Sequence, residues 1–497
     1  MSLTKVTNSM INGAPVNVLD FGAVGDGVVN DTAAFQAAIN TGKSVYVPDG
    51  KYNITLVNLN ENTSITGNGN KSIINVTSGN GFSYTGTPTY SSVIQISNLS
   101  FEIATLSTGV TFHPAFVNSS INVIGCNFYS GISGSQSAIG IFIYGSNGGL
   151  IKDNNFLGVS NYASSFECIQ IKGDATYNCI NINITCNFFK DVKKGIHIIG
   201  SSSAYNTTAG HRIVNNLMIG LPSYAVELSY CDYIPIQGNM FDFCGGGGPS
   251  GGGPDFAVIY ANHVHRLIIE SNWISARYNS FGIYFRADSA TSVTEIQGTV
   301  ITGNRFITMN YGGPYGTAIN IESSQVKLNG GTIANNYMSN IDNGIVLTGT
   351  ALNAIVQFHI FSNQILANPG KSISLNAYVA YTYINDNTLD VAVASDAIFG
   401  KTNGDSNYIG VNNLKGTSTF RRGKLIASGN GSTKVWTIPH DMQVAPQWAN
   451  ASSGDPDTTN GGLFVQYDST NIIINFVTAP ISGTNNVIVN WELSSFY

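Results

Sequence analysis

The sequence predicts an all-β chain: a parallel β-helix, or solenoid, with an N-terminal capping helix and a small C-terminal β-sandwich. Three observations predict this fold. An asparagine recurs every 23–33 residues between residues 65 and 414, and this spacing is the length of one turn of a parallel β-solenoid. One amphipathic helical segment precedes the repeats. Short alternating strands follow them.

The composition describes a chain that is polar without being strongly charged. Its 497 residues include 55 glycines, and 28 acidic against 22 basic residues give a net charge of -6. A nucleic-acid-binding protein is expected to carry a basic excess, so the composition favours a neutral or sugar-like partner over nucleic acid. No stretch of the sequence has the apolar length of a membrane span or of a signal peptide. The chain is therefore expected to be made in a cytosol and to stay soluble.

The six cysteines have neither CxxC spacing nor the density of a disulfide scaffold. They are expected to be buried and reduced, because a free cysteine behaves as a small hydrophobic side chain. The sequence predicts no metal site and no cofactor.

Residues 1–64 are predicted to form an N-terminal neck and a cap. Asn30 or Asp31 is a suitable N-cap for the segment TAAFQAAIN. Its apolar residues share one face at helical spacing, and they are Ala34, Phe35, Ala38 and Ile39. A single helix at the start of a β-rich array is expected to cover the open end of the core.

Residues 65–414 are predicted to form the β-helix, with a substrate groove. Strands of four or five residues cannot bury a core alone, but stacked coils bury one continuously. An asparagine at a fixed corner is expected to adopt left-handed backbone geometry and to hydrogen-bond to the asparagine of the next coil. The predicted column consists of Asn98, Asn127, Asn155, Asn187, Asn216, Asn239, Asn272, Asn304, Asn336, Asn363, Asn387 and Asn413.

A second strand in each repeat is expected to place polar side chains on the outer face, because alternate residues of a strand point to opposite sides. Alignment on the inward apolar residues gives three outward columns with a mixture of side chains that suits a carbohydrate. The first column holds Phe142, Gln170, His197, Glu227, Ile259, Tyr284, Asn320 and Val346; the second holds Tyr144, Lys172, Ile199, Ser229, Ala261, Arg286, Glu322 and Thr348; the third holds Asp174, Ser201, Cys231, His263, Asp288 and Ser324.

The column positions predict two candidate catalytic groups. Glu227 lies one coil above His197, in a crowded groove that suits an acid catalyst. Coils stack about 4.8 Å apart, which puts Glu322 one coil above Arg286 and about 8 Å from Asp288. Two carboxyls at that separation can flank a water for an inverting glycoside hydrolysis. Arg286 and Glu322 could together clamp a substrate, and they are equally consistent with a structural ion pair between coils.

The predicted catalytic residues are Glu227, Glu322 and Asp288. The predicted substrate-binding residues share the same face or flank it, and they are His197, Arg286, Tyr284, Gln170, Lys172, Asn320 and Asp255. Asp255 ends the glycine-rich insertion 244–255, which is expected to act as a lip over the groove.

Residues 415–424 are predicted to be a linker, and residues 425–497 a β-sandwich of short alternating strands. Trp436, Trp448 and Trp491 lie in this segment. Each could pack in the core or contact sugar, and core packing is favoured because of the area that a tryptophan buries.

The segments DFGAVGDG (20–27), NDTAAFQAAIN (30–40) and VYVPDGKY (45–52) resemble the opening of the pectate-lyase-like right-handed β-helix superfamily, in the form found in bacteriophage tailspikes. The glycine-rich part has neither the Lys-Ser/Thr of a P-loop nor the spacing of a dinucleotide-binding motif. The segment TAPISGTNNVIVNWEL (478–493) resembles the C-terminal β-sandwich of the same family.

The resemblance implies a homotrimeric tailspike depolymerase. Such a protein is made in the host cytoplasm, belongs to the virion tail and cuts a bacterial capsular or O-antigen polysaccharide at the cell surface. In that family the C-terminal module aids trimerisation or binds sugar. Little sequence precedes the cap, so the chain is expected either to have lost an anchoring domain or to dock on another phage tail protein.

Three functional classes remain open from the sequence. An endo-acting glycoside hydrolase is favoured, because acidic residues dominate the proposed columns. In a polysaccharide lyase, His197 or Lys172 would remove the proton beside a uronate while Arg286 neutralises its carboxylate. The third class is a non-catalytic receptor-binding fibre.

Overall fold

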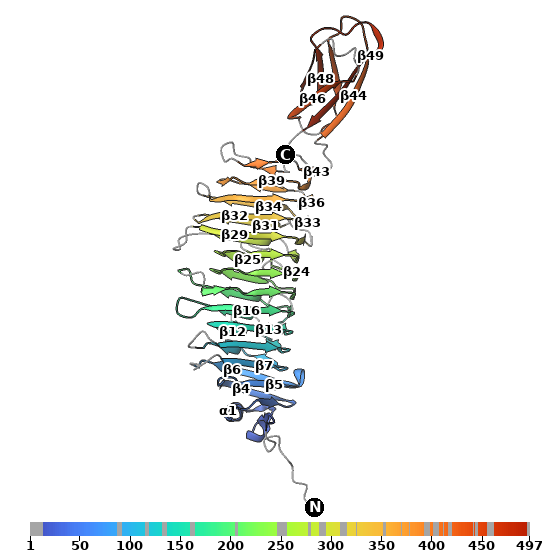
Figure 1. Ribbon diagram of the computed structural model, residues 1–497. Helices are drawn as coiled ribbons and strands as arrows, with labels where there is room; N and C mark the ends of the chain where they lie inside the picture. The colour runs from blue at the N-terminus through green and yellow to red at the C-terminus, as the bar shows by residue number, and fades with distance from the viewer. Residues whose placement is uncertain are drawn as a thin grey trace, which may run out of the picture.

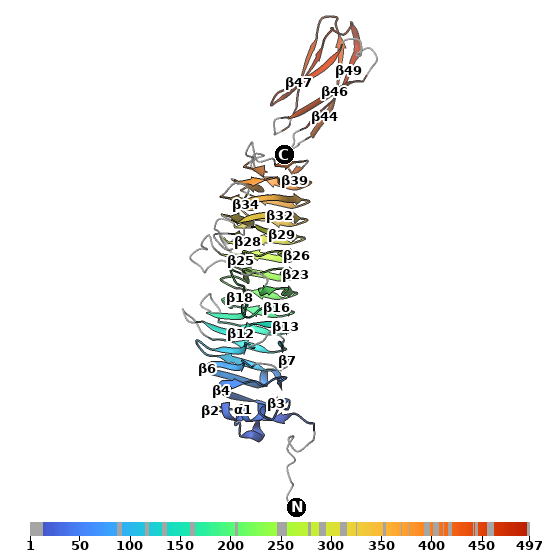
Figure 2. The same ribbon diagram turned by 60° about the vertical axis from the view of Figure 1, so that its left-hand side comes forward.

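The computed structural model describes residues 13–494 apart from short internal segments. The segments outside the description are 87–91, 115–118, 132–136, 160–164, 204–206, 246–255, 277–279, 288–294, 309–315, 325, 351–353, 369, 377, 392–397, 401–406, 411, 416–419, 441, 443–445 and 455–461. The described chain is a long stack of parallel β-coils with one helix at its N-terminal end and an antiparallel module beyond its C-terminal end (Figures 1 and 2). The predicted fold class is confirmed.

Most coils contribute three parallel strands, one more than the sequence analysis expected. The first strand belongs to a 17-stranded sheet, here called sheet A. Its members are β1 (Val16–Asn17), β3 (Val45–Val47), β5 (Ser64–Gly67), β7 (Ser92–Ser97), β10 (Ser119–Ile124), β13 (Ser146–Lys152), β16 (Cys179–Thr185), β19 (Thr208–Ala209), β20 (Arg212–Val214), β23 (Pro235–Gln237), β26 (Ile268–Glu270), β29 (Glu295–Thr302), β32 (Lys327–Ala334), β35 (Ile355–Phe361), β38 (Val379–Ala380), β39 (Tyr383–Asn385) and β42 (Tyr408–Ile409).

The other two strands of each coil belong to a 26-stranded sheet, here called sheet B. The second strand is short, and these strands are β8 (Ser100–Ile103), β11 (Asn127–Tyr129), β14 (Asn155–Leu157), β17 (Phe188–Lys190), β21 (Leu217–Ile219), β24 (Met240–Cys244), β27 (Trp273–Ala276), β30 (Arg305–Thr308), β33 (Tyr337–Ser339), β36 (Gln364–Asn368), β40 (Thr388–Val391) and β43 (Asn413–Lys415).

The third strand of each coil carries the candidate site. These strands are β9 (Thr108–Phe112), β12 (Ala138–Tyr144), β15 (Phe166–Lys172), β18 (Lys194–Ile199), β22 (Val226–Ser229), β25 (Ala257–Asn262), β28 (Phe281–Ala287), β31 (Thr317–Ser323), β34 (Asn343–Gly349), β37 (Ile373–Leu375) and β41 (Ile398–Phe399). In the first coils, sheet B consists of β2 (Asp26–Asn30), β4 (Gly50–Asn58) and β6 (Ser72–Tyr84), and β6 pairs with both β8 and β9.

The predicted capping helix is α1 (Thr32–Ile39), and it covers the N-terminal end of the solenoid (Figure 1). The four residues predicted to share its inner face, Ala34, Phe35, Ala38 and Ile39, are all buried in the solenoid core. Asp31 occupies the N-cap position but makes no side-chain cap bond, because its Oδ1 accepts a hydrogen bond from the Val24 amide at 2.7 Å. Asn30 Oδ1 accepts the bond from the Thr32 amide instead.

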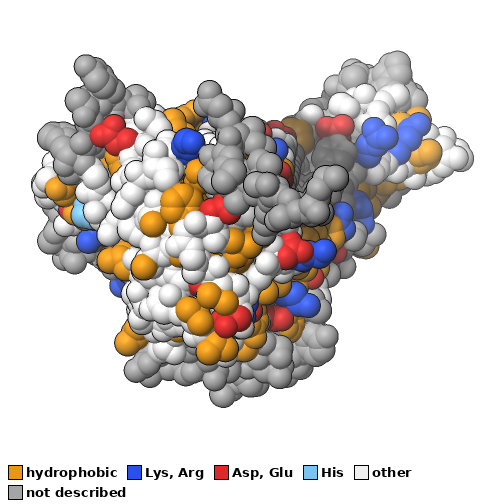
Figure 3. Space-filling view, turned by 90° about the horizontal axis from the view of Figure 1, so that it is seen from below, with side chains coloured by type: hydrophobic (Ala, Val, Ile, Leu, Met, Phe, Trp, Pro, Cys, Tyr) orange, Lys and Arg blue, Asp and Glu red, His pale blue; other side chains and the backbone are white. Residues whose placement is uncertain are grey.

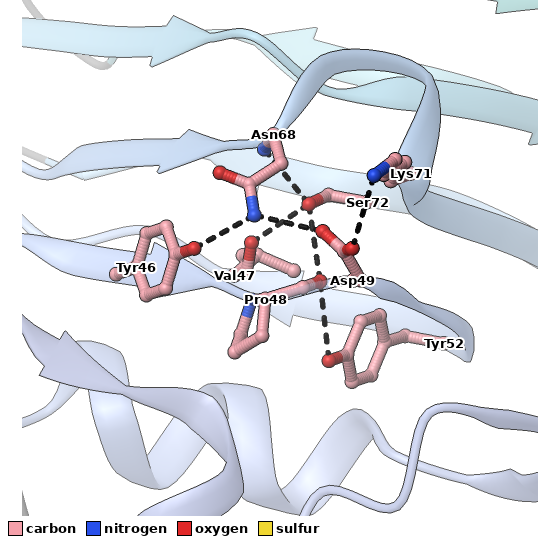
Figure 4. Close-up of polar contacts among 8 residues, drawn as sticks. All are labelled: Tyr46, Val47, Pro48, Asp49, Tyr52, Asn68, Lys71 and Ser72. Carbon is pink, nitrogen blue, oxygen red and sulfur yellow. Dashed lines mark hydrogen bonds and ion pairs between the residues drawn. The ribbon is translucent and has the colours of Figure 1, made fainter.

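Backbone and side-chain groups of the segment VYVPDGKY connect the coil of β3 and β4 to the next coil, which contains β5 and β6 (Figure 4). The Ser72 hydroxyl donates to the carbonyls of Val47 and Pro48 at 2.8 and 3.0 Å. The Asn68 amide donates to Tyr46 Oη and Asp49 Oδ1, both at 2.8 Å. This segment therefore has a structural role at the start of the stack.

The outer end of the cap is largely uncharged, and hydrophobic side chains lie on it in small groups (Figure 3). Exposed apolar residues of this end include Leu19, Val24, Val28 and Val29. Two 3-10 turns, η2 (Val18–Phe21) and η3 (Gly69–Lys71), accompany the first coils. No helix among the described residues is long and apolar enough to cross a membrane.

A buried asparagine ladder stabilises the corner between the first and second strands, but its register differs from the prediction at both ends. Asn154 Nδ2 donates to Asn187 Oδ1 at 3.0 Å. The same bond is repeated between the ladder asparagines of successive coils and ends at Asn412, which accepts from Asn387. Cys126 occupies the position before Asn154. Asn98, Asn127, Asn155 and Asn413 were therefore wrong as ladder members, because each lies one residue from the buried position. The left-handed residue is the one that precedes the ladder asparagine, as at Asn215 and Asn335.

The predicted outward columns are wrong by one residue in β25. Glu227 pairs with Tyr260, and Tyr260 pairs with Tyr284, while Asn262 pairs with Arg286. Ile259 and Ala261, which were placed in the outward columns, are fully buried. Cys231 and His263, placed in the third column, are also fully buried.

Five of the six cysteines are buried as expected, whereas Cys186 is exposed at a left-handed position. All six lie in the described part of the chain, and none forms a disulfide.

The C-terminal module consists of two three-stranded antiparallel sheets. One contains β44 (Phe420–Gly429), β49 (Gly483–Ser494) and β46 (Trp448–Ser453), and the other contains β45 (Val435–Pro439), β48 (Asn471–Phe476) and β47 (Leu463–Tyr467). Residues 420–424 of the predicted linker thus lie in β44. Trp491 is buried in the core and Trp436 packs edge-on against Phe476, whereas Trp448 is 41% exposed.

Candidate functional site

The outward side chains of the third strands form one continuous face along the solenoid, here called the site face. In-register pairing places Gln170 next to His197 and His197 next to Glu227. Tyr260, Tyr284 and Asn320 continue the same column. The strands are parallel and paired in register, so each coil adds one residue to the column. Neighbouring residues of the column lie about 4.8 Å apart, the spacing between strands.

Glu227 is held by two basic side chains from the coil below it. Lys194 Nζ lies 2.6 Å from Glu227 Oε2, and His197 Nε2 lies 3.6 Å from the same oxygen. All three side chains are only 13–17% exposed. The predicted neighbourhood of Glu227 and His197 is confirmed, whereas Lys194, which lies three residues before His197 on β18, was not predicted.

A second carboxylate lies on the opposite side of the His197 ring. Glu167 Oε2 is 3.7 Å from His197 Nδ1, and its side chain is 14% exposed. Glu167 was not predicted, because it lies near the start of β15 and none of the three outward columns includes its position. Glu167, Lys194, His197 and Glu227 form the cluster that we call the acid–histidine cluster.

Burial alone would raise the pKa of Glu167, but the His197 side chain and the Lys194 and Lys193 charges together hold that pKa below its usual value of 4.5. Because both carboxylates contact the same imidazole, Glu167 and Glu227 lie no more than about 10 Å apart, a limit that includes the separations of about 5–5.5 Å and about 6.5–9.5 Å found in retaining and inverting glycosidases. The cluster therefore contains two carboxylates that contact one imidazole ring from opposite sides.

The lowered pKa of Glu167 predicts a pH-dependent contribution to stability. A group whose pKa is lower in the folded state stabilises the fold above its unfolded pKa, here 4.5, and loses this effect as the pH falls through the folded value. We expect the thermal midpoint of the wild-type protein to fall more steeply below pH 4.5 than that of Glu167→Gln. Midpoints measured by circular dichroism from neutral pH to pH 3 test this, and parallel curves would contradict it.

Aromatic side chains flank the cluster on its N-terminal side. The His113 and Tyr144 rings lie 4.4 Å apart, Tyr177 packs against both, and Lys172 Nζ lies 5.2 Å from the Tyr144 ring centre. The Tyr144 hydroxyl donates to Asp174, and this bond lowers the pKa of Asp174. Lys172 is therefore placed against an aromatic ring and outside the acid–histidine cluster.

A second aromatic group follows the cluster on its C-terminal side. Tyr224 and Tyr260 are stacked with ring centres 5.1 Å apart, and Tyr284 meets Tyr260 edge-on at 5.6 Å. Lys194 Nζ also lies 5.9 Å from the Tyr224 ring centre. The second aromatic group thus contacts the acid–histidine cluster through Tyr224. Tyr260 was absent from the predicted columns because the predicted register of β25 was wrong by one residue.

Glu322 belongs to a separate centre. Its two oxygens accept hydrogen bonds from the Tyr284 hydroxyl at 2.7 Å and the Asn320 amide at 2.9 Å. Burial and the Glu322 carboxylate raise the pKa of Tyr284 well above its usual value. Arg286 pairs in register with Glu322. Three coils separate Glu227 from Glu322, about 14 Å along the solenoid, so these two carboxylates cannot act on one bond.

Two predicted site residues, Asp288 and Asp255, lie outside the described residues. The predicted pairing of Glu322 with Asp288 therefore stays a prediction. Within the described residues, no group of three or more His, Cys, Asp or Glu side chains has an arrangement that could hold a metal ion.

The fold and the site face define a parallel β-helix protein with a half-buried acid–histidine cluster between two aromatic groups. Residues 15–221 match the family model described as Rhamnogalacturonase A/epimerase, pectate lyase-like. Among solved structures, the tailspike gp61 of Pseudomonas phage phi297 is similar with a TM-score of 0.54 at 11% identity, covering 96% of this chain and 98% of that chain. The predicted resemblance to phage tailspikes of the right-handed β-helix type is confirmed at the level of the fold.

Two curated relatives match short segments. The pre-neck appendage protein of Bacillus phage B103 is 46% identical over 55 residues, which is 11% of this chain and 6% of the relative. Mannuronan C5-epimerase AlgE5 of Azotobacter vinelandii is 54% identical over 44 residues, which is 8% of this chain and 4% of the relative. The matched segments thus span only a small part of these curated relatives.

Proposed function

We propose that this chain is a bacteriophage tailspike that recognises and depolymerises a bacterial surface polysaccharide, either capsule or O-antigen, by endo-glycosidic hydrolysis. The observation that carries the proposal is the acid–histidine cluster between two aromatic groups on one continuous face. Sugar ring faces pack on aromatic side chains, and paired carboxylates perform glycoside hydrolysis. The similarity to a tailspike and to a phage appendage protein supports a place in the virion tail.

In the proposed reaction, a water attacks the anomeric carbon while the glycosidic carbon–oxygen bond breaks. Glu167, whose pKa is lowered, accepts the proton from the water. Glu227 enters the reaction protonated and donates this proton to the leaving oxygen, and Lys194, 2.6 Å away, then stabilises the resulting carboxylate. The His197 ring contacts one carboxylate through each nitrogen, so it can carry the proton from Glu167 back to Glu227 and restore the starting state.

A lyase reaction is the second candidate, and a specific observation favours it. Lys194 and His197 lie within the same cluster as the two glutamates, and either could act as the base that removes a proton beside a uronate. The family model matched by residues 15–221 and the epimerase relative are consistent with chemistry at that carbon. Arg286 remains the proposed partner of the uronate carboxylate.

Assembly as a homotrimer and docking on another phage tail protein are further parts of the proposal. They follow from the resemblance to tailspikes. Sedimentation equilibrium of the full chain tests the trimer, and a mass of one chain would contradict it.

Mass analysis of fragments released from a panel of capsular and O-antigen polysaccharides tests the proposed function. Hydrolysis is expected to release fragments that have each gained one water. Fragments that absorb near the ultraviolet edge, and have not gained water, would identify a lyase. Retention of a polysaccharide without release of any fragment would identify a non-catalytic receptor-binding fibre and overturn the proposal of an enzyme.

A further inference from the structure

A column of residues with left-handed backbone runs along sheet A, on strands that do not contribute to the site face. One residue in the middle of successive sheet A segments has a left-handed backbone, and these residues lie in register from coil to coil. The column contains Gly148, Asn181, Gly210, Tyr233, Arg266, Gly298, Gly330 and Gln357. Four residues of this column, Arg266, Gly298, Gly330 and Gln357, line one pocket.

The pocket lies across β29, β32, β35 and β39 and has a volume of about 740 Å³. This volume lies within the range of about 300–1,000 Å³ typical of ligand sites. Gly298 and Gly330 line the pocket, and a Cβ atom at Gly330 would meet no other atom within 4 Å, so the backbone is open to the pocket there. We call this the sheet A groove.

One wall of the sheet A groove is formed by oriented amides. Gln297 Nε2 and Asn329 Nδ2 donate to the same Glu295 oxygen at 2.6 and 2.7 Å. These shared bonds fix two amides on adjacent coils relative to each other. Fixed amide and carboxylate groups provide donors and acceptors for hydroxyl groups of a ligand.

The other wall is aromatic. Tyr383 packs against His359 with ring centres 5.0 Å apart and against Tyr408 at 5.8 Å. Tyr383 is nevertheless 46% exposed. Since both neighbours restrict the ring, it offers a rigid apolar surface at little cost in side-chain entropy.

The charges around the groove are balanced within the protein. Arg266 lies at one end, and its Nε donates to Asp232 Oδ1 at 2.8 Å while its second nitrogen bonds to the other carboxylate oxygen. Glu295 is paired with Lys327 at 3.8 Å. A groove with hydrogen-bonding amides, an aromatic wall and compensated charges favours a ligand that is rich in hydroxyl groups and uncharged where it makes contact.

We propose that the sheet A groove is a second, non-catalytic glycan-binding site that holds a few sugar units of a polysaccharide. The class of ligand, a polysaccharide, rests on the proposed function. The location of this site and its non-catalytic role go beyond that function. A polymer bound here stays attached to the protein while another segment enters the site face, and this raises the effective concentration of polymer at that face.

The test compares the retention of bacterial capsular and O-antigen polysaccharides, immobilised as an array, by two forms of the full chain. The parent is Glu227→Gln, which keeps the polymers intact, and the test variant adds Gln297→Ala and Tyr383→Ala. Retention of at least one polysaccharide by the parent, weakened at least about tenfold in the test variant, is expected. Both added changes are at exposed positions, and melting curves verify that the variant is folded.

A matched control adds Tyr129→Ala to the parent instead. Tyr129 is a similarly exposed tyrosine, at 45%, on the short strand β11 of sheet B, and its removal is expected to leave retention unchanged. Equal retention by the parent and the groove variant, or no retention of any polysaccharide by the parent, would overturn the proposal. The proposed function is tested independently by the release of fragments from the same panel by the wild-type chain. Absence of fragments would contradict the proposed function and not the binding site.

Discussion

Glu227→Gln is expected to lower kcat/KM for polysaccharide depolymerisation by about 10³-fold, because general acid–base catalysis contributes roughly 10²–10⁴-fold to such reactions. Glutamine keeps the size of the side chain but cannot donate the proton to the leaving oxygen. It also removes the carboxylate that Lys194, 2.6 Å from Oε2, stabilises once the proton has left. The measurement is the initial rate of reducing-end release from the polysaccharide that the wild-type chain degrades.

Glu322→Gln is the matched control, because it makes the same change in a carboxylate of the same face. Glu322 accepts bonds from Tyr284 and Asn320 and lies three coils away from Glu227. Its substitution is expected to lower the rate by less than about tenfold, through weaker substrate binding. If Glu322→Gln removes activity and Glu227→Gln does not, the catalytic centre is the predicted Glu322–Asp288 pair and the acid–histidine cluster has another role.

The fold was predictable from the sequence because its signals are repeated many times. From Asn154 to Asn412 successive coils carry an asparagine at the same corner, and apolar residues recur at the same inward positions, so an error in one coil does not change the overall pattern. The capping helix was predictable for a different reason. Its buried face, including Phe35 and Ile39, follows helical spacing without interruption.

The ladder register was harder to predict, because several coils contain two adjacent polar residues at the corner. In NNF, either Asn154 or Asn155 could have been the ladder member. The structure selects Asn154, since its amide lies in the buried position that donates to the Val123 carbonyl at 2.9 Å. The hydrogen bonds that identify the ladder member join different coils. The residue pattern of a single coil therefore cannot show which asparagine it is.

The one-residue error at β25 has a similar origin. Val258 and Ile259 are adjacent and both fully buried, so apolar alternation cannot decide which of them points inward on the strand. The pairing of Ala257 with Phe281 and of Tyr260 with Tyr284 determines the register. The error removed Tyr260 from the site face and hid the aromatic group next to Glu227.

Lys194 and Glu167 were missed for a third reason. Each lies at the start of its strand, on coils next to those of the residues that it contacts. Their importance depends on side-chain reach between coils, and an alignment of strand centres contains no information about it. The structure was therefore needed to combine four separated residues into one cluster.

Asn272→Ala is expected to lower the free energy of unfolding by about 3–6 kcal/mol, since each buried polar group left without a partner costs roughly 1–3 kcal/mol. Asn272 Oδ1 accepts bonds from the backbone and side-chain nitrogens of Asn239, at 2.9 and 3.0 Å. Its own amide donates to the Ile236 carbonyl at 2.9 Å and to Asn304 Oδ1 at 3.0 Å. Alanine keeps the backbone but removes these partners in the middle of the ladder.

Guanidinium denaturation of the wild-type protein and of Asn272→Ala, followed by circular dichroism, measures the difference in their free energies of unfolding. Asn155→Ala is the matched control, because Asn155 also stacks on an asparagine of the previous coil, donating to Asn127 Oδ1 at 2.7 Å. Asn155 is only partly buried, so water can replace the lost bond and a loss of about 1 kcal/mol is expected. Equal losses in the two variants would show that the ladder owes its stability to the stacking of asparagine amides in general. A larger loss at Asn272 would show that the stability depends on satisfying the backbone of both neighbouring coils.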